Sequence, residues 1–189
     1  MYKAIVIGGS IGGLEAVVSI TSGLPRDYHL PVIIVLHRIK NQKSGLVEVI
    51  QAKCKIKVKE ADEKESIRPG FVYIAPANYH LLIEEEETFS LTYSELVNYS
   101  RPSIDVLFES AAEVYKDKLI GILLTGANDD GSNGIKMISE YGGLTVVQDP
   151  KTAKCDIIPK SAIAKTKVDK ILNLNEIQFF LLNLNKVDV

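Results

Sequence analysis

Cysteine and histidine are scarce in this 189-residue sequence, and their scarcity limits the kinds of site it can form. The two cysteines, Cys54 and Cys155, lie far apart, and neither belongs to a Cys-x-x-Cys pair. This usage is typical of isolated thiols in a cytoplasmic protein rather than of a disulfide framework. The three histidines and these cysteines show no metal-ligand spacing, so we expect no metal site and no other cofactor.

Net charge and long apolar runs are also lacking. The 22 lysines and arginines nearly balance the 24 aspartates and glutamates, which gives a formal net charge of −2. This balance does not favour binding to nucleic acid or to an anionic membrane. No apolar run approaches the roughly 20 residues of a membrane-spanning helix, and the amino terminus shows no signal-peptide pattern. We therefore expect a cytoplasmic protein that does not insert into the membrane.

The remaining composition is that of an ordinary globular protein, with 46% hydrophobic and 24% charged residues. The length suits one domain with a substantial core, and no linker, repeat or low-complexity segment divides it, so we predict a single domain over residues 1–189. Short apolar runs alternate with helical patterns, which predicts an α/β fold with a doubly wound, mainly parallel sheet and flanking helices. A β-hairpin with an acidic tip is predicted as an insertion in the middle of the chain.

The predicted elements follow from apolar runs, periodicity and glycine or proline boundaries. The predicted strands cover residues 4–7, 31–36, 55–60 and 71–76, then the hairpin at 80–83 and 88–93, then 118–124 and 144–147. The predicted helices cover about 14–22, 44–52, 100–114 with Pro102 in the first turn, a segment with Ile135 and Ile138, a short segment at 162–164 after Pro159, and the tail from 175.

The turn after the first strand concentrates glycine around one polar side chain. Ala4–Ile7 is followed by Gly8–Gly13, in which Ser10 stands between two glycine pairs. A strand, a glycine turn and a helix serve two mechanisms, dinucleotide binding through G-x-G-x-x-G and a nucleophile elbow through G-x-S-x-G. The segment fits the second as written, and fits the first only if Ser10 replaces the middle glycine. The turn alone leaves both open.

Three predicted buried strands end in reactive side chains: Ser10, His37, and the pair Asp129 and Asp130. In a parallel sheet the carboxyl ends of the strands share one edge, where ligands bind. Serine, histidine and aspartate are the components of a nucleophilic triad. Their order differs from the Ser…Asp…His order of the α/β-hydrolases, which argues against that fold but not against the chemistry.

Five motifs extend this pattern over nearly the whole chain. They are Val6–Gly13, Val35–His37, Tyr73–Pro76 with His80, Arg101–Phe108 and Leu123–Gly131. In this order and spacing they resemble the catalytic domain of the chemotaxis protein-glutamate methylesterase, CheB. Five separated motifs in register are much more specific than one glycine turn.

The resemblance implies a serine esterase that hydrolyses glutamate γ-methyl esters on the cytoplasmic helices of chemoreceptors and releases methanol. Some members also deamidate receptor glutamines. By motif position, Ser10 matches the nucleophile, His37 the base, and Asp130 rather than Asp129 the triad aspartate. Backbone N–H groups near Ile11 and Ala127 match the oxyanion hole.

The sequence also departs from the family pattern. The family usually has threonine at Ile11, Met-Pro at Arg38–Ile39, methionine at Ala127 and glycine at Asn128. Familiar members carry an amino-terminal receiver domain, whereas this sequence starts at the catalytic strand. We therefore expect either a stand-alone member or a fragment, with any receiver domain or other regulator as a separate partner.

Two further hypotheses remain at this stage. The substitutions at Ile11, Ala127 and Asn128 suggest a catalytically weak or inactive receptor-binding module of the same fold. A nucleotide-binding oxidoreductase would need a free middle glycine and an acidic residue near the end of the second strand. Ser10 and His37 stand at those places, which argues against it.

Overall fold

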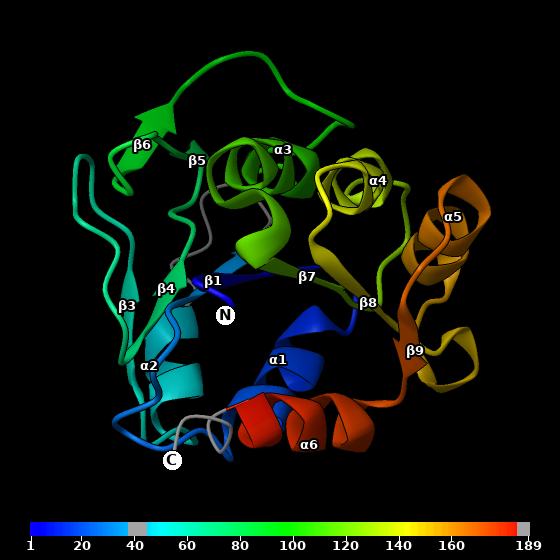
Figure 1. The fold of residues 1–189 in the computed structure, drawn as a ribbon, viewed down its shortest axis with the longest axis horizontal. Helices are drawn as coiled ribbons and strands as arrows, with labels where there is room; N and C mark the ends of the chain where they lie inside the picture. Colours follow the sequence, from blue (N-terminus) through cyan, green and yellow to red (C-terminus); the bar gives the residue numbers. More distant parts are fainter. Residues whose placement is uncertain (38–44, 185–189) are drawn as a thin grey trace.

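A seven-stranded parallel sheet forms the centre of the computed structural model, which describes residues 1–37 and 45–184 (Figure 1). The strand order is β3-β4-β2-β1-β7-β8-β9, and every pair is parallel. The strands are β1 (Ala4–Gly9), β2 (Val32–Leu36), β3 (Lys57–Glu60), β4 (Phe71–Ile74), β7 (Leu119–Leu123), β8 (Leu144–Gln148) and β9 (Lys170–Leu172). The antiparallel hairpin of β5 (His80–Ile83) and β6 (Phe89–Thr92) lies beside the sheet.

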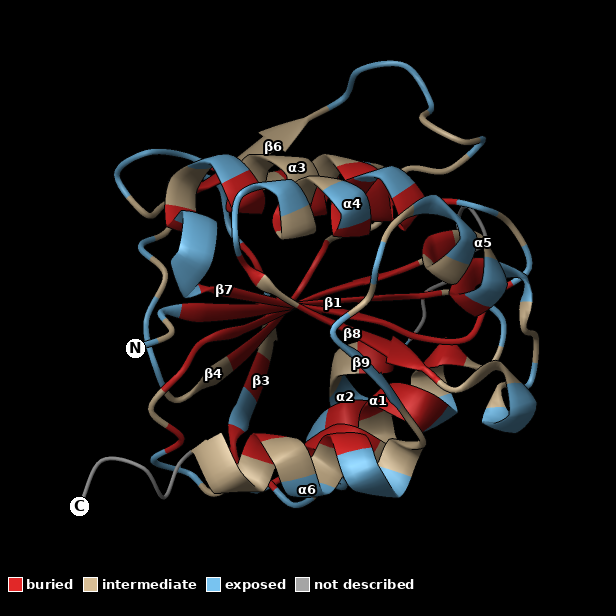
Figure 2. Ribbon diagram, turned by 45° about the vertical axis from the view of Figure 1, so that its right-hand side comes forward, coloured by how far each residue is buried: buried red, intermediate tan, exposed pale blue. Residues whose placement is uncertain are grey.

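Helices cover both faces of the sheet. One face carries α1 (Gly13–Thr21), α2 (Leu46–Gln51) and α6 (Leu174–Leu184), and the other carries α3 (Ile104–Tyr115), α4 (Ser132–Glu140) and α5 (Ile157–Lys165) (Figures 1 and 2). Two short 3-10 helices complete the list, η1 (Lys116–Lys118) and η2 (Pro150–Thr152). None of the helices in the described ranges combines the length and apolar character that a membrane crossing requires.

The core has two halves because β1 is buried on both faces (Figure 2). Side chains alternate along a strand, so Ile5 and Ile7 pack into the cluster under α1 and α6. Ala4 and Val6 pack into the opposite cluster under α3 and α4. A fully buried parallel strand reads as a continuous apolar run, which is why the sequence predicted this strand clearly.

The connections diverge at the middle of the sheet. The chain leaves β1 for α1 and β2 on one side, and later enters β7 on the other side of β1 after crossing the opposite face in α3. The carboxyl end of β1 therefore lies at a topological switch point, the position at which open α/β sheets generally bind their ligands. Ser10 directly follows this end.

Most predicted elements are confirmed within a few residues, but two helix starts differ from the prediction and one strand was not predicted. Pro102 lies outside α3, because the helix begins at Ile104 with Ser103 as its amino-terminal cap residue. The short helix predicted after Pro159 begins earlier, at Ile157, and contains the proline in its first turn, where a missing N–H costs no helical hydrogen bond. The edge strand β9 was not predicted, because three partly exposed residues carry no readable pattern.

Candidate active site

The residues that directly follow β1, β2 and β7 lie together at the carboxyl edge of the sheet. Main-chain hydrogen bonds continue past the strands: His37 donates to the Gly9 carbonyl at 3.2 Å, and Ser10 donates to the Thr125 carbonyl at 2.9 Å. These bonds fix the residues that follow the three strands relative to one another. The sequence-based expectation that Ser10, His37 and the β7 loop share this edge is confirmed for the backbone.

The turn after β1 exposes Ser10 and leaves little space behind it. Gly13 donates its N–H to the Ser10 carbonyl at 2.7 Å, which starts α1, and Gly12 adopts a left-handed conformation with φ 77°. A Cβ atom at Gly126 would lie 2.8 Å from the Cβ atom of Ser10. The Ser10 side chain therefore lies directly against the β7 loop, and only glycine at position 126 allows this approach.

The side chains of His37 and Asp130 form the shortest hydrogen bond of the site. The Nε2 atom of His37 lies 2.6 Å from the Oδ2 atom of Asp130. The Asp130 side chain is completely buried, and that of His37 is 13% exposed. An ionised carboxylate only accepts hydrogen bonds, so Nε2 carries the proton and the Nδ1 atom of neutral His37 keeps a free electron pair. Nδ1 is therefore the atom that can take a proton from a nucleophile.

The Asp130 carboxylate is held at the amino terminus of α3. Its Oδ2 atom accepts the N–H of Ile104 at 2.7 Å, and its Oδ1 atom accepts the N–H of Asp105 at 3.1 Å and the hydroxyl of Ser103 at 2.8 Å. Asn98 donates its side-chain amide to Oδ1 at 3.1 Å. Free N–H groups and the helix dipole stabilise negative charge at this position.

These hydrogen bonds determine whether the Asp130 carboxyl group is ionised. Burial disfavours its ionised form, but the hydrogen bonds from His37 and from the Ile104 N–H outweigh burial, and the pKa of Asp130 lies below its ordinary value. The carboxylate is therefore ionised at neutral pH. An ionised Asp130 can stabilise a positive imidazolium on His37, as a triad aspartate must.

Two serines lie near His37. The Ser100 hydroxyl is 3.4 Å from Nδ1 of His37, a long hydrogen bond. Within residues 1–37 and 45–184, no hydrogen bond joins the Ser10 hydroxyl to His37 or to another side chain. Catalytic hydrogen bonds are often long or unformed in a free enzyme. The structure therefore joins His37 with Asp130, places Ser10 in the adjoining turn, and brings the Ser100 hydroxyl close to His37.

Ile11 directly follows Ser10, and Ala127 directly follows Gly126, the residue that lies against Ser10. Neither the Ile11 nor the Ala127 backbone N–H has a hydrogen-bond partner in the part of the chain that the structure describes. The Ile11 side chain is 53% exposed, and Ala127 is exposed as well. Unpaired N–H groups beside a candidate nucleophile are what an oxyanion hole requires.

Thr125 ties the Ser10 turn to the neighbouring loop. Its buried hydroxyl lies 2.9 Å from the Ile11 carbonyl oxygen and 3.0 Å from that of Cys155, and it accepts the Cys155 N–H at 2.8 Å. The Thr125 N–H donates to the side-chain oxygen of Gln148 at 3.0 Å. The Thr125 hydroxyl, in the loop after β7, thus holds the main chain of Ile11, whose side chain is exposed.

Sequence reasoning missed the residues that surround the triad positions. Asn98, Ser103 and Asp105 contact Asp130, and Ser100 contacts His37. Ser103 before an apolar helical pattern is a readable cap signal, but the others carry no local signature.

The departure at Arg38–Ile39 lies outside the described residues. Within the described ranges, no group of three histidine, cysteine, aspartate or glutamate residues has an arrangement that could hold a metal ion.

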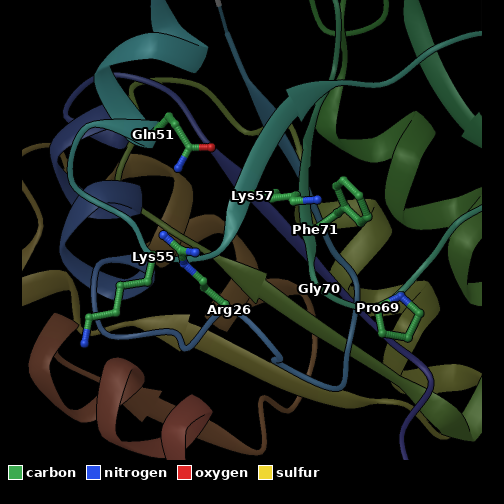
Figure 3. A pocket seen from close by; sticks show the side chains of 7 residues that line it. All are labelled: Arg26, Gln51, Lys55, Lys57, Pro69, Gly70 and Phe71. Carbon is green, nitrogen blue, oxygen red and sulfur yellow. The ribbon is translucent and has the colours of Figure 1, made fainter.

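A separate cavity of about 470 Å³ lies at the opposite edge of the sheet (Figure 3). Its lining residues are Arg26, Gln51, Lys55, Lys57, Pro69, Gly70 and Phe71. Lys57 and Phe71 are the first residues of β3 and β4 and pair with each other, which places the cavity at the amino ends of the strands. It therefore contains none of the groups described above.

Known proteins share the sequence pattern and the fold of this chain. The family model for CheB methylesterase matches residues 5–181. The chain belongs to the CheB methylesterase family. A crystal structure of the CheB methylesterase catalytic domain from Thermotoga maritima superposes with a TM-score of 0.92 at 34% identity, covering 97% of this chain and 99% of that one. The fold predicted from the sequence is that of the CheB catalytic domain.

Relatives of known name fall into two groups by length. A Leptospira interrogans protein, named provisionally as a protein-glutamate methylesterase/protein-glutamine glutaminase, is 52% identical over 98% of this chain and 96% of its own length. The Thermotoga maritima protein-glutamate methylesterase/protein-glutamine glutaminase is 34% identical over 96% of this chain but only 54% of its own length. The CheB relative from Clostridium acetobutylicum, which has the same name, is 33% identical, and this chain covers 51% of it. The chain thus spans about half of these longer relatives and nearly all of the shorter one.

Proposed function

We propose that this chain is a protein-glutamate methylesterase that hydrolyses glutamate γ-methyl esters on the cytoplasmic helices of methylated chemoreceptors during chemotactic adaptation. The observation that carries the proposal is the His37–Asp130 pair, which leaves Nδ1 of His37 available beside the turn that exposes Ser10. Membership of the CheB family supports the substrate class. Such a substrate would place the reaction in the cytoplasm.

In the proposed mechanism Ser10 is the nucleophile. Its hydroxyl oxygen attacks the ester carbonyl carbon while Nδ1 of His37 takes its proton. Nε2–H of His37 remains bonded to Asp130, whose charge stabilises the imidazolium. The backbone N–H groups of Ile11 and Ala127 stabilise the oxyanion of the tetrahedral intermediate.

The imidazolium then gives its proton to the methoxy oxygen, and methanol leaves an acyl-enzyme on Ser10. In the second half, His37 takes a proton from water, and the resulting hydroxide attacks the acyl carbon. Collapse returns the proton to the Ser10 oxygen and releases the glutamic acid side chain, which then loses its proton to solvent. The same steps with ammonia as the leaving group would deamidate glutamine, as the names of the relatives suggest.

The proposal predicts the effect of two matched substitutions. Methanol release from a methylated receptor fragment is measured for the unmodified protein, Ser10→Ala and Ser100→Ala. We expect the loss of Ser10 to reduce kcat by several orders of magnitude, because triad residues act as a unit. We expect Ser100→Ala to retain most of the activity.

Two other outcomes would contradict the proposal. Full activity in Ser10→Ala would remove Ser10 as the nucleophile, and loss of activity only in Ser100→Ala would transfer the role to Ser100. No methanol release by the unmodified protein, with retained binding to the receptor fragment, would support the inactive receptor-binding module instead.

A further inference from the structure

A second buried carboxylate lies beside Asp130 and has no role in the reaction described above. The Asp105 side chain belongs to α3 and is 2% exposed. Its Oδ1 atom accepts the N–H of Gly134 at 2.7 Å, at the amino end of α4. Asp130, from the loop before α4, accepts the N–H groups at the amino end of α3. A carboxylate from α3 thus binds the amino end of α4, and a carboxylate from the loop before α4 binds the amino end of α3.

One side chain connects the two carboxylates. The Nδ2 atom of Asn98 lies 2.9 Å from Oδ2 of Asp105 and 3.1 Å from Oδ1 of Asp130. A side-chain amide nitrogen has two hydrogens, so it can donate to both oxygens at once. Two buried carboxylates repel each other when both are ionised, and a hydrogen-bond donor placed between them offsets part of this repulsion. Burial raises the pKa of Asp105 above its ordinary value, and the nearby charge of Asp130 adds to this effect.

A tight turn presents Asn98 to the carboxylates. Val97 and Ser100 exchange two main-chain hydrogen bonds, of 3.2 and 2.8 Å. The two central residues, Asn98 and Tyr99, have φ of 48° and 61°, as in a type I′ turn. Tyr99 is 99% exposed, whereas the Asn98 and Ser100 side chains reach Asp130 and His37. The turn therefore directs the Asn98 amide inward while the neighbouring Tyr99 side chain points into solvent.

We infer that Asn98 is a positioning residue for the triad aspartate, an inference that rests on the proposed function. Of the three donors to Oδ1 of Asp130, two come from the start of α3, namely the hydroxyl of the cap residue Ser103 and the Asp105 N–H. Asn98 approaches from the β6–α3 loop and is in turn held by Asp105. It fixes the rotation of the Asp130 carboxylate about its Cβ–Cγ bond, so that Oδ2 stays directed at Nε2 of His37.

The test separates the amide of Asn98 from its backbone conformation. Positive φ favours asparagine or glycine, so Asn98→Gly removes the amide without straining the turn. Asn133→Ala is the matched control, because Nδ2 of Asn133 also donates to Oδ2 of Asp105, at 3.1 Å, and makes no hydrogen bond to Asp130. kcat and KM for methanol release are measured together with the proton NMR resonance of the His37 Nε2–H group.

We expect Asn98→Gly to reduce kcat by about 10- to 50-fold, as for one lost hydrogen bond to a charged group, with KM changed less than twofold. The Nε2–H resonance of His37 should move upfield and broaden. In Asn133→Ala, kcat should change less than threefold and the resonance should stay in place. If Asn98→Gly is poorly folded by circular dichroism, Asn98→Ala replaces it, because alanine also lacks the amide and adds no charge between the two carboxylates.

Unchanged kcat and an unchanged His37 resonance in Asn98→Gly would overturn the inference and leave the residue with a role in the turn alone. Equal losses in Asn98→Gly and Asn133→Ala would also overturn it, since they would show a general dependence on the Asp105 network. The NMR measurement needs no substrate. It therefore decides the role of Asn98 even if the unmodified protein releases no methanol and the proposed function fails.

Discussion

Nε2 of His37 lies 2.6 Å from Oδ2 of Asp130, so the histidine faces its carboxylate through Nε2 and offers Nδ1 to the nucleophile. This orientation follows from where the two residues stand in the fold. His37 directly follows β2, and Asp130 is fixed by main-chain N–H groups at the amino terminus of α3. The backbone at the end of β2 and the backbone at the amino terminus of α3 therefore set the geometry of the pair.

Asp130→Asn is expected to reduce kcat on the order of 10³- to 10⁴-fold, because an amide in place of the carboxylate no longer stabilises the imidazolium or fixes the tautomer. Steady-state kinetics of methanol release provide the measurement. Asp129→Asn is the matched control, since Asp129 is the exposed neighbour and makes no side-chain contact with His37 in the described structure. Comparable losses in both variants would contradict the assignment of Asp130.

Asp130 should also make stability depend on pH. Its pKa is lowered in the folded state, so its ionised form stabilises the fold above the unfolded-state pKa of about 4. This contribution is lost as the pH falls through the lower folded-state value. Urea unfolding from pH 2.5 to 7 should therefore show a decline in acid for the unmodified protein that is smaller in Asp130→Asn. Parallel curves for the two proteins would contradict the lowered pKa.

Thr125→Val should reduce both stability and activity. Valine keeps the shape of threonine but leaves the Cys155 N–H and the Ile11 carbonyl without their shared partner, at a cost of about 2 kcal/mol in unfolding free energy. We expect kcat to fall about tenfold as the residue after Ser10 loses its support. Thr125→Ser retains the hydroxyl and should recover most of the activity. Equal activity in the two variants would show that the hydroxyl does not act on the site.

Gly126→Ala tests the close approach of the β7 loop to Ser10. A Cβ atom here would lie 2.8 Å from Cβ of Ser10 and 2.3 Å from Cδ1 of Ile158. Overpacking of this kind costs about 1–3 kcal/mol of unfolding free energy, measured by urea denaturation. Displacement of the loop should also reduce kcat. Unaltered stability and kcat would show that the two loops are farther apart in solution.

The sequence predicted the layered fold well because the central strands are buried on both faces. β1 and β7 appear as unbroken apolar runs, and the glycines and polar residues that follow them mark the sheet edge. Because the carboxyl ends of parallel strands share one edge, the sequence also predicted Ser10, His37 and Asp130 at that edge. The prediction for Pro102 was wrong, because contacts with Asp130 and His80, from other parts of the chain, define the cap at Ser103.

The surroundings of the site could not be predicted in the same way. Asn98 lies 32 residues from Asp130 and reaches it through a turn in which both central residues have positive φ. Asp105 looks like any acidic residue in the first turn of a helix, and only the packing of α3 against α4 places it beside Asp130. Such pairings depend on tertiary structure, and local periodicity does not encode them.

The most direct test of the central claim is covalent labelling with a serine-reactive fluorophosphonate, followed by mass spectrometry of the proteolytic peptides. The account predicts a single adduct on Ser10, in the peptide that contains the turn after β1, and a large loss of labelling in His37→Ala. An adduct on Ser100, or no adduct on Ser10 in a protein that still releases methanol, would contradict it.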